Sequence, residues 1–234
     1  MTKLEMGVRY EMRKLLKHGV LFIVGVAAFL GAVQVIALPF TGSEWFGSVG
    51  FGGSYAFAYL FFVFWTAIAF DKDAGLFLQS GLTRREMFAI FSLAVVVEAF
   101  GFALLDAVMS LAVPGFWVEQ SLFLRMAGSY SAALFIQVFL LNLTVASCTL
   151  VVTVLKRRVG TGWTVAILIG LYALVAVVLP GCFFLVPGGI EAYGRSMAAL
   201  TGSPFAPAIP IVLCAALTWA LLRRANADRF AAAR

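Results

Sequence analysis

Residues 87–113 read MFAIFSLAVVVEAFGFALLDAVMSLAV, an apolar run whose only charged side chains are Glu98 and Asp106. A membrane-spanning helix needs about 20 apolar residues, because ~30 Å of hydrocarbon must be crossed at ~1.5 Å per residue. The run lacks the alternation of apolar and polar residues that is typical of a barrel strand. A helix, in contrast, satisfies its own backbone hydrogen bonds in lipid. We therefore expect a transmembrane helix here.

Five further stretches have the same character and lie at residues 19–40, 51–70, 131–155, 163–180 and 206–222. Across the 234 residues, 63% are apolar and 12% are charged, whereas a soluble domain carries roughly 25% charged residues. This composition excludes a soluble enzyme and a disordered chain, and three cysteines are too few for a secreted disulfide scaffold. The sequence predicts an all-α integral membrane protein with six transmembrane helices in a single domain, residues 1–234.

The basic residues lie almost entirely on one side of the predicted spans. Of the 17 lysines and arginines, only Arg125 and Arg195 fall in loops on the other side. By the positive-inside rule, both termini are then cytoplasmic. The net charge of +6 is explained by membrane orientation, so we expect no nucleic-acid partner.

Two segments outside the spans have patterns of their own. In residues 1–18 the apolar and basic side chains fall on opposite arcs of a helical wheel, which predicts an interfacial helix in contact with anionic membrane lipid. Its apolar arc comprises Leu4, Val8, Met12, Leu15 and Leu16. Residues 181–205, on the outer side, are barely polar and predict a semi-buried external loop or short helix.

The residues that usually carry enzyme chemistry are almost absent from this chain. The single histidine, His18, lies at the membrane edge, away from any nucleophile within the spans. Cys148, Cys182 and Cys214 belong to three different regions and are interpreted as small apolar fillers. The sequence has neither a cluster of metal ligands nor a glycine-rich phosphate-binding loop. We expect no catalytic residue, metal or cofactor on this chain.

A few side chains inside the predicted spans are candidates for contacting a substrate. Glu98 lies near the middle of its span, where an isolated carboxylate is costly and should face the bundle interior. Glu98 and Asp106 can contact a substrate or proton, or form interhelical hydrogen bonds. Tyr55, Tyr59 and Phe62 form a stripe at i, i+4 and i+7 that suits either a substrate wall or helix packing. Both interpretations stay open.

The connection between the second and third spans, residues 71–86, has more local structure than a simple loop needs. Thr83 and Glu86 have the spacing of a capping box, so the third span should begin directly after Thr83. Residues 76–79 can form a short helix, and Gly81 can supply the turn that ends it. This stiffness favours a cytoplasmic coupling segment that receives a push from a soluble partner.

The arrangement resembles the permease subunits of type 2 ABC exporters, which have an interfacial helix, six spans, cytoplasmic termini and a coupling helix between spans 2 and 3. The most specific local match is LFLQSGLTRREMF at residues 76–88, which is similar to the family's pattern of leucines, a glycine, Thr/Ser-Arg and a hydrophobic helix. The resemblance covers essentially the full chain.

This resemblance implies alternating access in a bacterial cytoplasmic membrane. It implies a separate ATP-binding subunit that holds ATP and Mg, and a second permease copy in a homo- or heterodimer. The residues implied in coupling to the ATPase are Gly81, Thr83, Arg84, Arg85 and Glu86. The implied substrate path includes Tyr55, Tyr59, Phe62 and Glu98.

The apolar and aromatic spans favour a hydrophobic or amphipathic substrate, such as a drug, lipid or peptide. Two other function classes are left open. One is the ligand-capturing membrane subunit of a vitamin-type importer, which would bind its ligand alone. The other is a membrane-embedded enzyme, such as a protease or lipid transferase, which the missing nucleophile arrangement disfavours. We expect a transport subunit without an ATPase site of its own.

Overall fold

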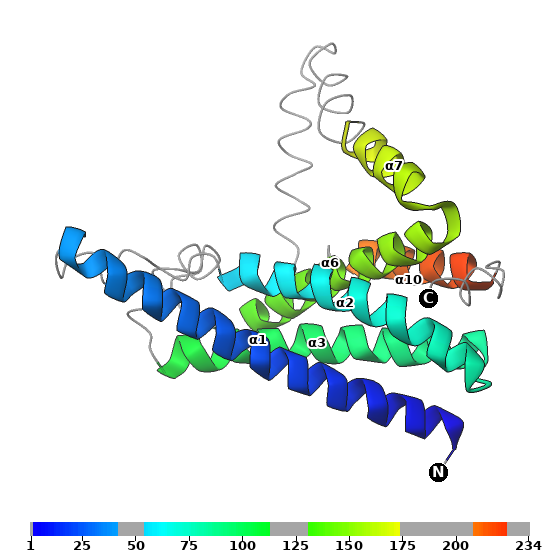
Figure 1. Cartoon of the computed structure of the whole chain (residues 1–234), viewed down its shortest axis with the longest axis horizontal. Helices are drawn as coiled ribbons and strands as arrows, with labels where there is room; N and C mark the ends of the chain where they lie inside the picture. Colours follow the sequence, from blue (N-terminus) through cyan, green and yellow to red (C-terminus); the bar gives the residue numbers. More distant parts are fainter. Residues whose placement is uncertain (1, 42–53, 113–130, 174–207, 224–234) are drawn as a thin grey trace.

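The computed structural model describes residues 2–41, 54–112, 131–173 and 208–223. Every regular element within these ranges is an α-helix (Figure 1). In chain order the helices are α1 (Lys3–Thr41), α2 (Ser54–Gln79), α3 (Arg84–Ala112), α6 (Ala132–Val159), α7 (Thr161–Ala173) and α10 (Ala208–Arg223). Each overlaps one predicted apolar stretch, so the all-helical fold class is confirmed. The predicted external segment, residues 181–205, lies outside the described residues.

Two of these helices are long and apolar enough to cross a membrane, namely Arg84–Val108 within α3 and Ala132–Val159, which is α6. The start of α6 is fixed locally, because Ser131 Oγ accepts a hydrogen bond of 3.2 Å from the Leu134 N–H and so acts as its N-cap. The shorter apolar helices are Thr161–Gly170 and Ala208–Arg223.

The first helix, α1, differs from the sequence-based expectation. We predicted an interfacial helix over residues 1–18; residues 3–18 are helical and form the first part of one continuous helix, and their placement at a membrane surface stays a prediction. The reason is local: no proline precedes Pro39, so nothing breaks the helix between its amphipathic start and its apolar remainder.

The apolar arc of α1 packs against protein. Leu15 is buried in the core cluster, and Leu4, Val8 and Met12 pack against that cluster. Leu16, which the helical wheel placed on the same arc, is 70% exposed. An amphipathic arc has the same pattern whether lipid or another helix covers it, and here α2 and α3 cover it.

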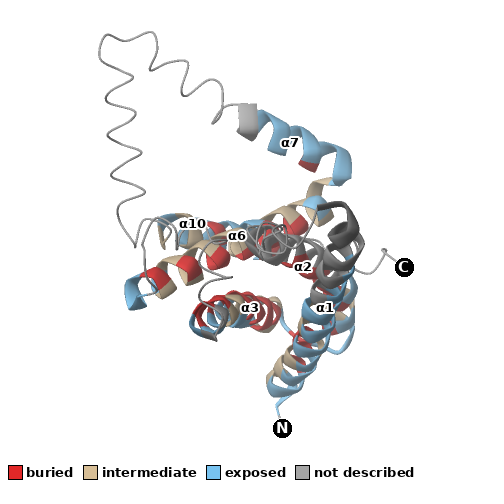
Figure 2. Ribbon diagram, turned by 90° about the vertical axis from the view of Figure 1, so that its left-hand side faces the viewer, coloured by how far each residue is buried: buried red, intermediate tan, exposed pale blue. Residues whose placement is uncertain are grey.

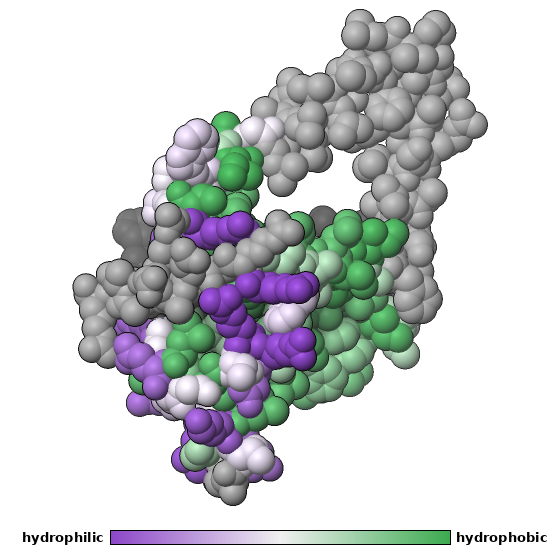
Figure 3. Space-filling model, turned by 90° about the vertical axis from the view of Figure 1, so that its right-hand side faces the viewer, coloured by the Kyte–Doolittle hydropathy of each residue, from purple (hydrophilic) through white to green (hydrophobic). Residues whose placement is uncertain are grey.

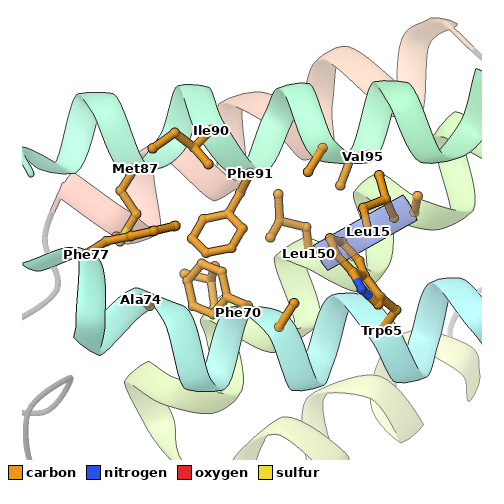
Figure 4. Packing of buried hydrophobic residues seen from close by; sticks show 14 of the residues in the cluster. Leu15, Trp65, Phe70, Ala74, Phe77, Met87, Ile90, Phe91, Val95 and Leu150 are labelled. Carbon is orange, nitrogen blue, oxygen red and sulfur yellow. The ribbon is translucent and has the colours of Figure 1, made fainter. Parts of the chain in front are cut away.

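The core lies between α1, α2, α3 and α6, with α10 on the far side of α6 (Figures 1 and 2). Aromatic rings from adjacent helices meet in it (Figure 4): the Phe91 ring of α3 lies 4.8 Å from Phe70 and 5.7 Å from Phe77 of α2, between ring centroids. Leu15 of α1, Leu150 of α6 and Leu222 of α10 belong to the same cluster. These contacts align the ends of α1, α2 and α3.

One end of the bundle gathers the polar segments. The N-terminus, the α2–α3 turn, the α6–α7 junction and the end of α10 all lie there (Figure 1). Viewed from this end, hydrophilic side chains occupy the centre, and hydrophobic side chains cover the flank (Figure 3). We call this the polar end. It contains Lys156, Arg157 and Arg158 from the last turn of α6.

Helix α7 leaves the bundle after Gly160, which ends α6 with a positive φ of 90° and whose N–H donates to Lys156 O at 2.9 Å. Among the α7 side chains that are described, only Thr164 is buried. Its apolar side chains, including Trp163 at 71% exposure, have no covering helix among the described residues (Figure 2).

Candidate functional site

The polar end holds the turn between α2 and α3, where the sequence analysis placed the coupling residues. Gly81 has a φ of +78°, a left-handed conformation that glycine adopts without a Cβ penalty. Its N–H donates to Leu78 O at 3.1 Å, and the Leu82 N–H donates to Phe77 O at 3.0 Å. This pair of bonds is a Schellman motif. The predicted glycine turn is therefore present.

The turn ends α2 itself. Residues 76–79, predicted as a separate short helix, are the last turn of α2, which runs unbroken to Gln79. Their separation was wrong because Asp71, Lys72 and Asp73 do not interrupt the helix: Asp73 is buried against α1. The turn thus connects two long helices directly.

The start of α3 is capped as predicted. The Thr83 N–H donates to Glu86 Oε2 at 2.7 Å, and the Glu86 N–H donates to Thr83 Oγ1 at 3.3 Å. These are the two reciprocal bonds of a capping box. Leu82 and Met87, which flank the cap, are both buried in the core cluster. Both helix ends at this turn are therefore held by hydrogen bonds.

The two arginines of the turn have different surroundings. Arg84 Nη1 donates to the backbone carbonyl of Arg223 at 2.9 Å, so Arg84 satisfies an oxygen at the C-terminus of α10. Arg85, its neighbour, is exposed. Of the predicted coupling residues, Gly81, Thr83 and Glu86 shape the turn, Arg84 ties it to α10, and Arg85 faces outward.

Beside this turn, the structure brings together a group of side chains that the sequence analysis did not single out. Tyr10 and Lys14 of α1 both bind Asp73 of α2: the Tyr10 hydroxyl donates to Oδ1 at 3.3 Å, and Lys14 Nζ forms an ion pair with Oδ2. The Tyr10 ring also meets the edge of the Phe77 ring. Glu11, next to them on α1, is fully buried. We call Tyr10, Glu11, Lys14 and Asp73 the α1–α2 polar cluster.

Burial governs the electrostatics of this cluster. Burial first, and then the Asp73 carboxylate, raises the pKa of Glu11 to about 8. The same two causes raise the pKa of the Tyr10 hydroxyl above its usual value. Neither carboxyl oxygen of Glu11 has a hydrogen-bond partner. The sequence held one signal for this cluster, since Glu11 falls on the apolar arc of α1 between Gly7 and Leu15.

Glu98, a predicted substrate contact, is 3% exposed in the bundle interior, as expected for a carboxyl in a span. Thr66 of α2 lies beside it and is equally buried. Neither the Glu98 oxygens nor Thr66 Oγ1 complete a hydrogen bond. Asp106, further along α3, is also buried. Glu98 and Thr66 thus bring polar side chains into the interior without a hydrogen bond between them.

The other predicted path residues, Tyr55, Tyr59 and Phe62, belong to α2, but their side chains lie outside the described part of the chain. Their grouping with Glu98 stays a prediction. Two of the cysteines, which come from different regions of the chain, lie close together in the structure: Cys148 Sγ of α6 lies 3.4 Å from Cys214 Sγ of α10. No sequence spacing signals this pair, because it depends on how α6 and α10 pack. Cys182 lies outside the described residues.

Among the described residues, no three histidine, cysteine or acidic side chains come together as metal ligands. Comparisons with known proteins add no relative: no family model, no curated protein and no solved structure matches this chain. The function is therefore inferred from the chain's own residues.

Proposed function

We propose that this chain is the membrane-spanning permease subunit of a type 2 ABC exporter in a bacterial cytoplasmic membrane. It would cross the membrane six times, with both termini in the cytoplasm. A separate subunit would bind ATP and Mg, and a second permease copy, identical or different, would complete the path. The substrate would be hydrophobic or amphipathic: a drug, lipid or peptide.

The observation that carries this proposal is the doubly capped turn between α2 and α3. The Gly81 motif fixes the end of α2, and the Thr83–Glu86 box fixes the start of α3. A force on this turn would therefore move both helices rather than deform a loop. Arg84 extends the same movement to α10 through Arg223. A turn built only to connect two helices needs none of these bonds.

The surface character of the bundle supports the membrane part of the proposal. Besides the two long apolar helices, α3 exposes a row of large apolar side chains that water would not favour: Val97, Phe100, Leu104 and Leu111. The polar end carries the basic segments, which suits a cytoplasmic face. Arg9, Arg13 and Lys17 line the exposed side of α1 and would meet anionic lipid headgroups.

In the proposed cycle, ATP closes the two partner subunits against each other. Their movement is received by Gly81, Arg85 and the neighbouring cap residues. α2 and α3 then tilt together, and a path lined from α2 and by Glu98 opens outward. Glu98 is the one path residue whose side chain the structure describes, and its unpartnered oxygens leave it available to a polar part of the substrate.

The test is purification of the tagged chain in a mild detergent, without crosslinking, from cells that also express the ATP-binding subunit of a neighbouring gene. Co-purification of that subunit, with ATP hydrolysis stimulated by substrate after reconstitution, is the expected result. A tightly bound ligand without an ATPase would replace the proposal with the importer subunit. Turnover by the chain alone would replace it with a membrane enzyme.

A further inference from the structure

We propose that Glu11 and Asp73 form a proton-binding site between α1 and α2, in which one proton is shared by two buried carboxyl groups. This site rests on the packing of α1 against α2 alone and does not depend on the transport function.

If both carboxyl groups were ionised, their two negative charges would be balanced by only one positive charge at this place. Asp73, which is 3% exposed, already holds the Tyr10 hydroxyl and the Lys14 ammonium group. Glu11 lies beside it with no exposed surface and with both oxygens unpartnered. An ionised carboxylate in such a place costs several kcal/mol unless it is neutralised or hydrogen-bonded. A proton on Glu11 removes the charge and lets Glu11 donate a hydrogen bond to Asp73.

Among the described side chains, no other charged group takes the place of that proton. On α1, Arg13 and Lys17 belong to the exposed side of the helix. On α2, Lys72 is exposed. The buried residues of α3 at this level are apolar, namely Met87, Ile90, Phe91 and Ala94, and the next carboxyl of α3, Glu98, lies one turn beyond Ala94. Within the described part of the chain, Lys14 is thus the one cation that acts directly on the two carboxyls.

The site would bind and release its proton within the pH range of a cytoplasm. Burial and Asp73 raise the pKa of Glu11 to about 8. At neutral pH the proton is bound, and α1 can pack closely on α2. Above that pKa two buried carboxylates would lie side by side with one lysine, which is paired with Asp73, and their repulsion would loosen the first half of α1. The loosened region would include Tyr10 and its contact with Phe77, directly before the α2–α3 turn.

The experiment is infrared difference spectroscopy of the full-length chain in lipid vesicles, with glutamate labelled at its side-chain carboxyl carbon with ¹³C. The label separates protonated glutamic acid from aspartic acid. The expected result is a protonated-glutamic-acid band that is lost with a midpoint near pH 8. Glu11→Gln should abolish this band. Asp73→Asn should move the midpoint to lower pH, because it removes the repelling charge and frees Lys14 to pair with Glu11.

Glu98→Gln is the matched control, since it removes another buried carboxyl of the bundle and should leave the midpoint unchanged. The proposal is overturned if no glutamic-acid band titrates between about pH 6 and pH 9 in the unmodified chain. It is equally overturned if the titrating band survives in Glu11→Gln. Should that variant fail to insert, Asp73→Asn decides, and an unchanged midpoint there rejects the shared site.

Discussion

Arg84 Nη1 donates a hydrogen bond of 2.9 Å to the carbonyl oxygen of Arg223 and so joins the first residue of α3 to the last residue of α10. The two residues are 139 positions apart in the chain. The bond links three helices at the polar end, because α3 begins at the turn that ends α2. Its partner is a main-chain oxygen, so the bond does not depend on the side chain at position 223.

Replacing Arg84 with alanine should lower stability, since a carbonyl at the C-terminus of α10 loses its donor. The expected loss is about 1 kcal/mol, typical of a hydrogen bond with partial solvent access. The measurement is unfolding of the detergent-solubilised chain by a denaturing detergent. Arg85→Ala, at the exposed neighbouring position, is the control and should change stability less. Equal losses for the two variants would show that the bond to Arg223 contributes nothing.

Gly81→Ala should destabilise the turn, because alanine is strained at a φ of +78°. The expected cost is roughly 1–2 kcal/mol, the penalty for a Cβ in the left-handed conformation. Gly101→Ala is a suitable control: Gly101 lies within α3, and no atom lies within 4 Å of an added Cβ. That substitution should be neutral or stabilising. The same unfolding assay compares both, and a neutral Gly81→Ala would contradict the described turn.

The stability of the chain should fall as the pH rises towards 8. The pKa of Glu11 is raised from its ordinary value of 4.5 to about 8, so between these values the folded state binds the extra proton. Stability from this group is therefore greatest below the unfolded pKa of 4.5 and falls by on the order of 1 kcal/mol per pH unit as the pH rises towards 8, because the unfolded chain releases this proton first. Unfolding free energies at several pH values should show a slope that Glu11→Gln reduces. An unchanged slope would refute the role of Glu11.

Coupling should depend on Arg85, the exposed member of the turn. In the proposed complex, reconstituted with its ATP-binding subunit, Arg85→Glu should abolish substrate-stimulated ATP hydrolysis while insertion is retained, because the reversed charge would face that subunit. Lys17→Glu, also a reversal of an exposed cation but on α1, is the control. Full stimulated hydrolysis with Arg85→Glu would remove Arg85 from the coupling surface.

Mild oxidation should connect α6 and α10. The thiols of Cys148 and Cys214 lie 3.4 Å apart, so small rotations of the side chains can bring the sulfurs into bonding distance. A copper–phenanthroline oxidant would accept the two electrons, and the two thiol protons would be released as the disulfide forms. Peptide mapping by mass spectrometry should find the 148–214 crosslink, and Cys148→Ala should eliminate it. Failure to form it in the unmodified chain would contradict the packing of α6 against α10.

Features of the fold that depend on neighbouring residues were predictable from sequence. The six helical stretches follow from long apolar runs, and the α2–α3 turn follows from Gly81, Thr83 and Glu86, whose preferences are local. Features that depend on how helices pack were not predictable. The Glu11–Asp73 cluster requires a particular alignment of α1 and α2, and the cysteine pair requires one of α6 and α10.

The prediction for residues 1–18 illustrates a different limit of what a sequence can predict. An apolar arc at helical spacing indicates only that one face avoids water. The sequence of residues 1–18 could not distinguish lipid from α2 and α3 as the covering surface. Glu11 was the residue that favoured protein over lipid as the covering surface. A carboxylate on the apolar arc is unfavourable in lipid, but it can be accommodated beside Asp73 and Lys14.

Gly7 is a second position, besides Glu11, at which the packing of the first half of α1 can be changed. A Cβ added there would lie 2.6 Å from Ile90 Cδ1, and Ile90 is itself fully buried, so its side chain has little room to turn away. A single methyl group at position 7 would thus act as a wedge between α1 and α3. It would do by volume what loss of the proton does by charge, one helical turn away. Gly7→Ala therefore offers a way to lift the N-terminal half of α1 at any pH.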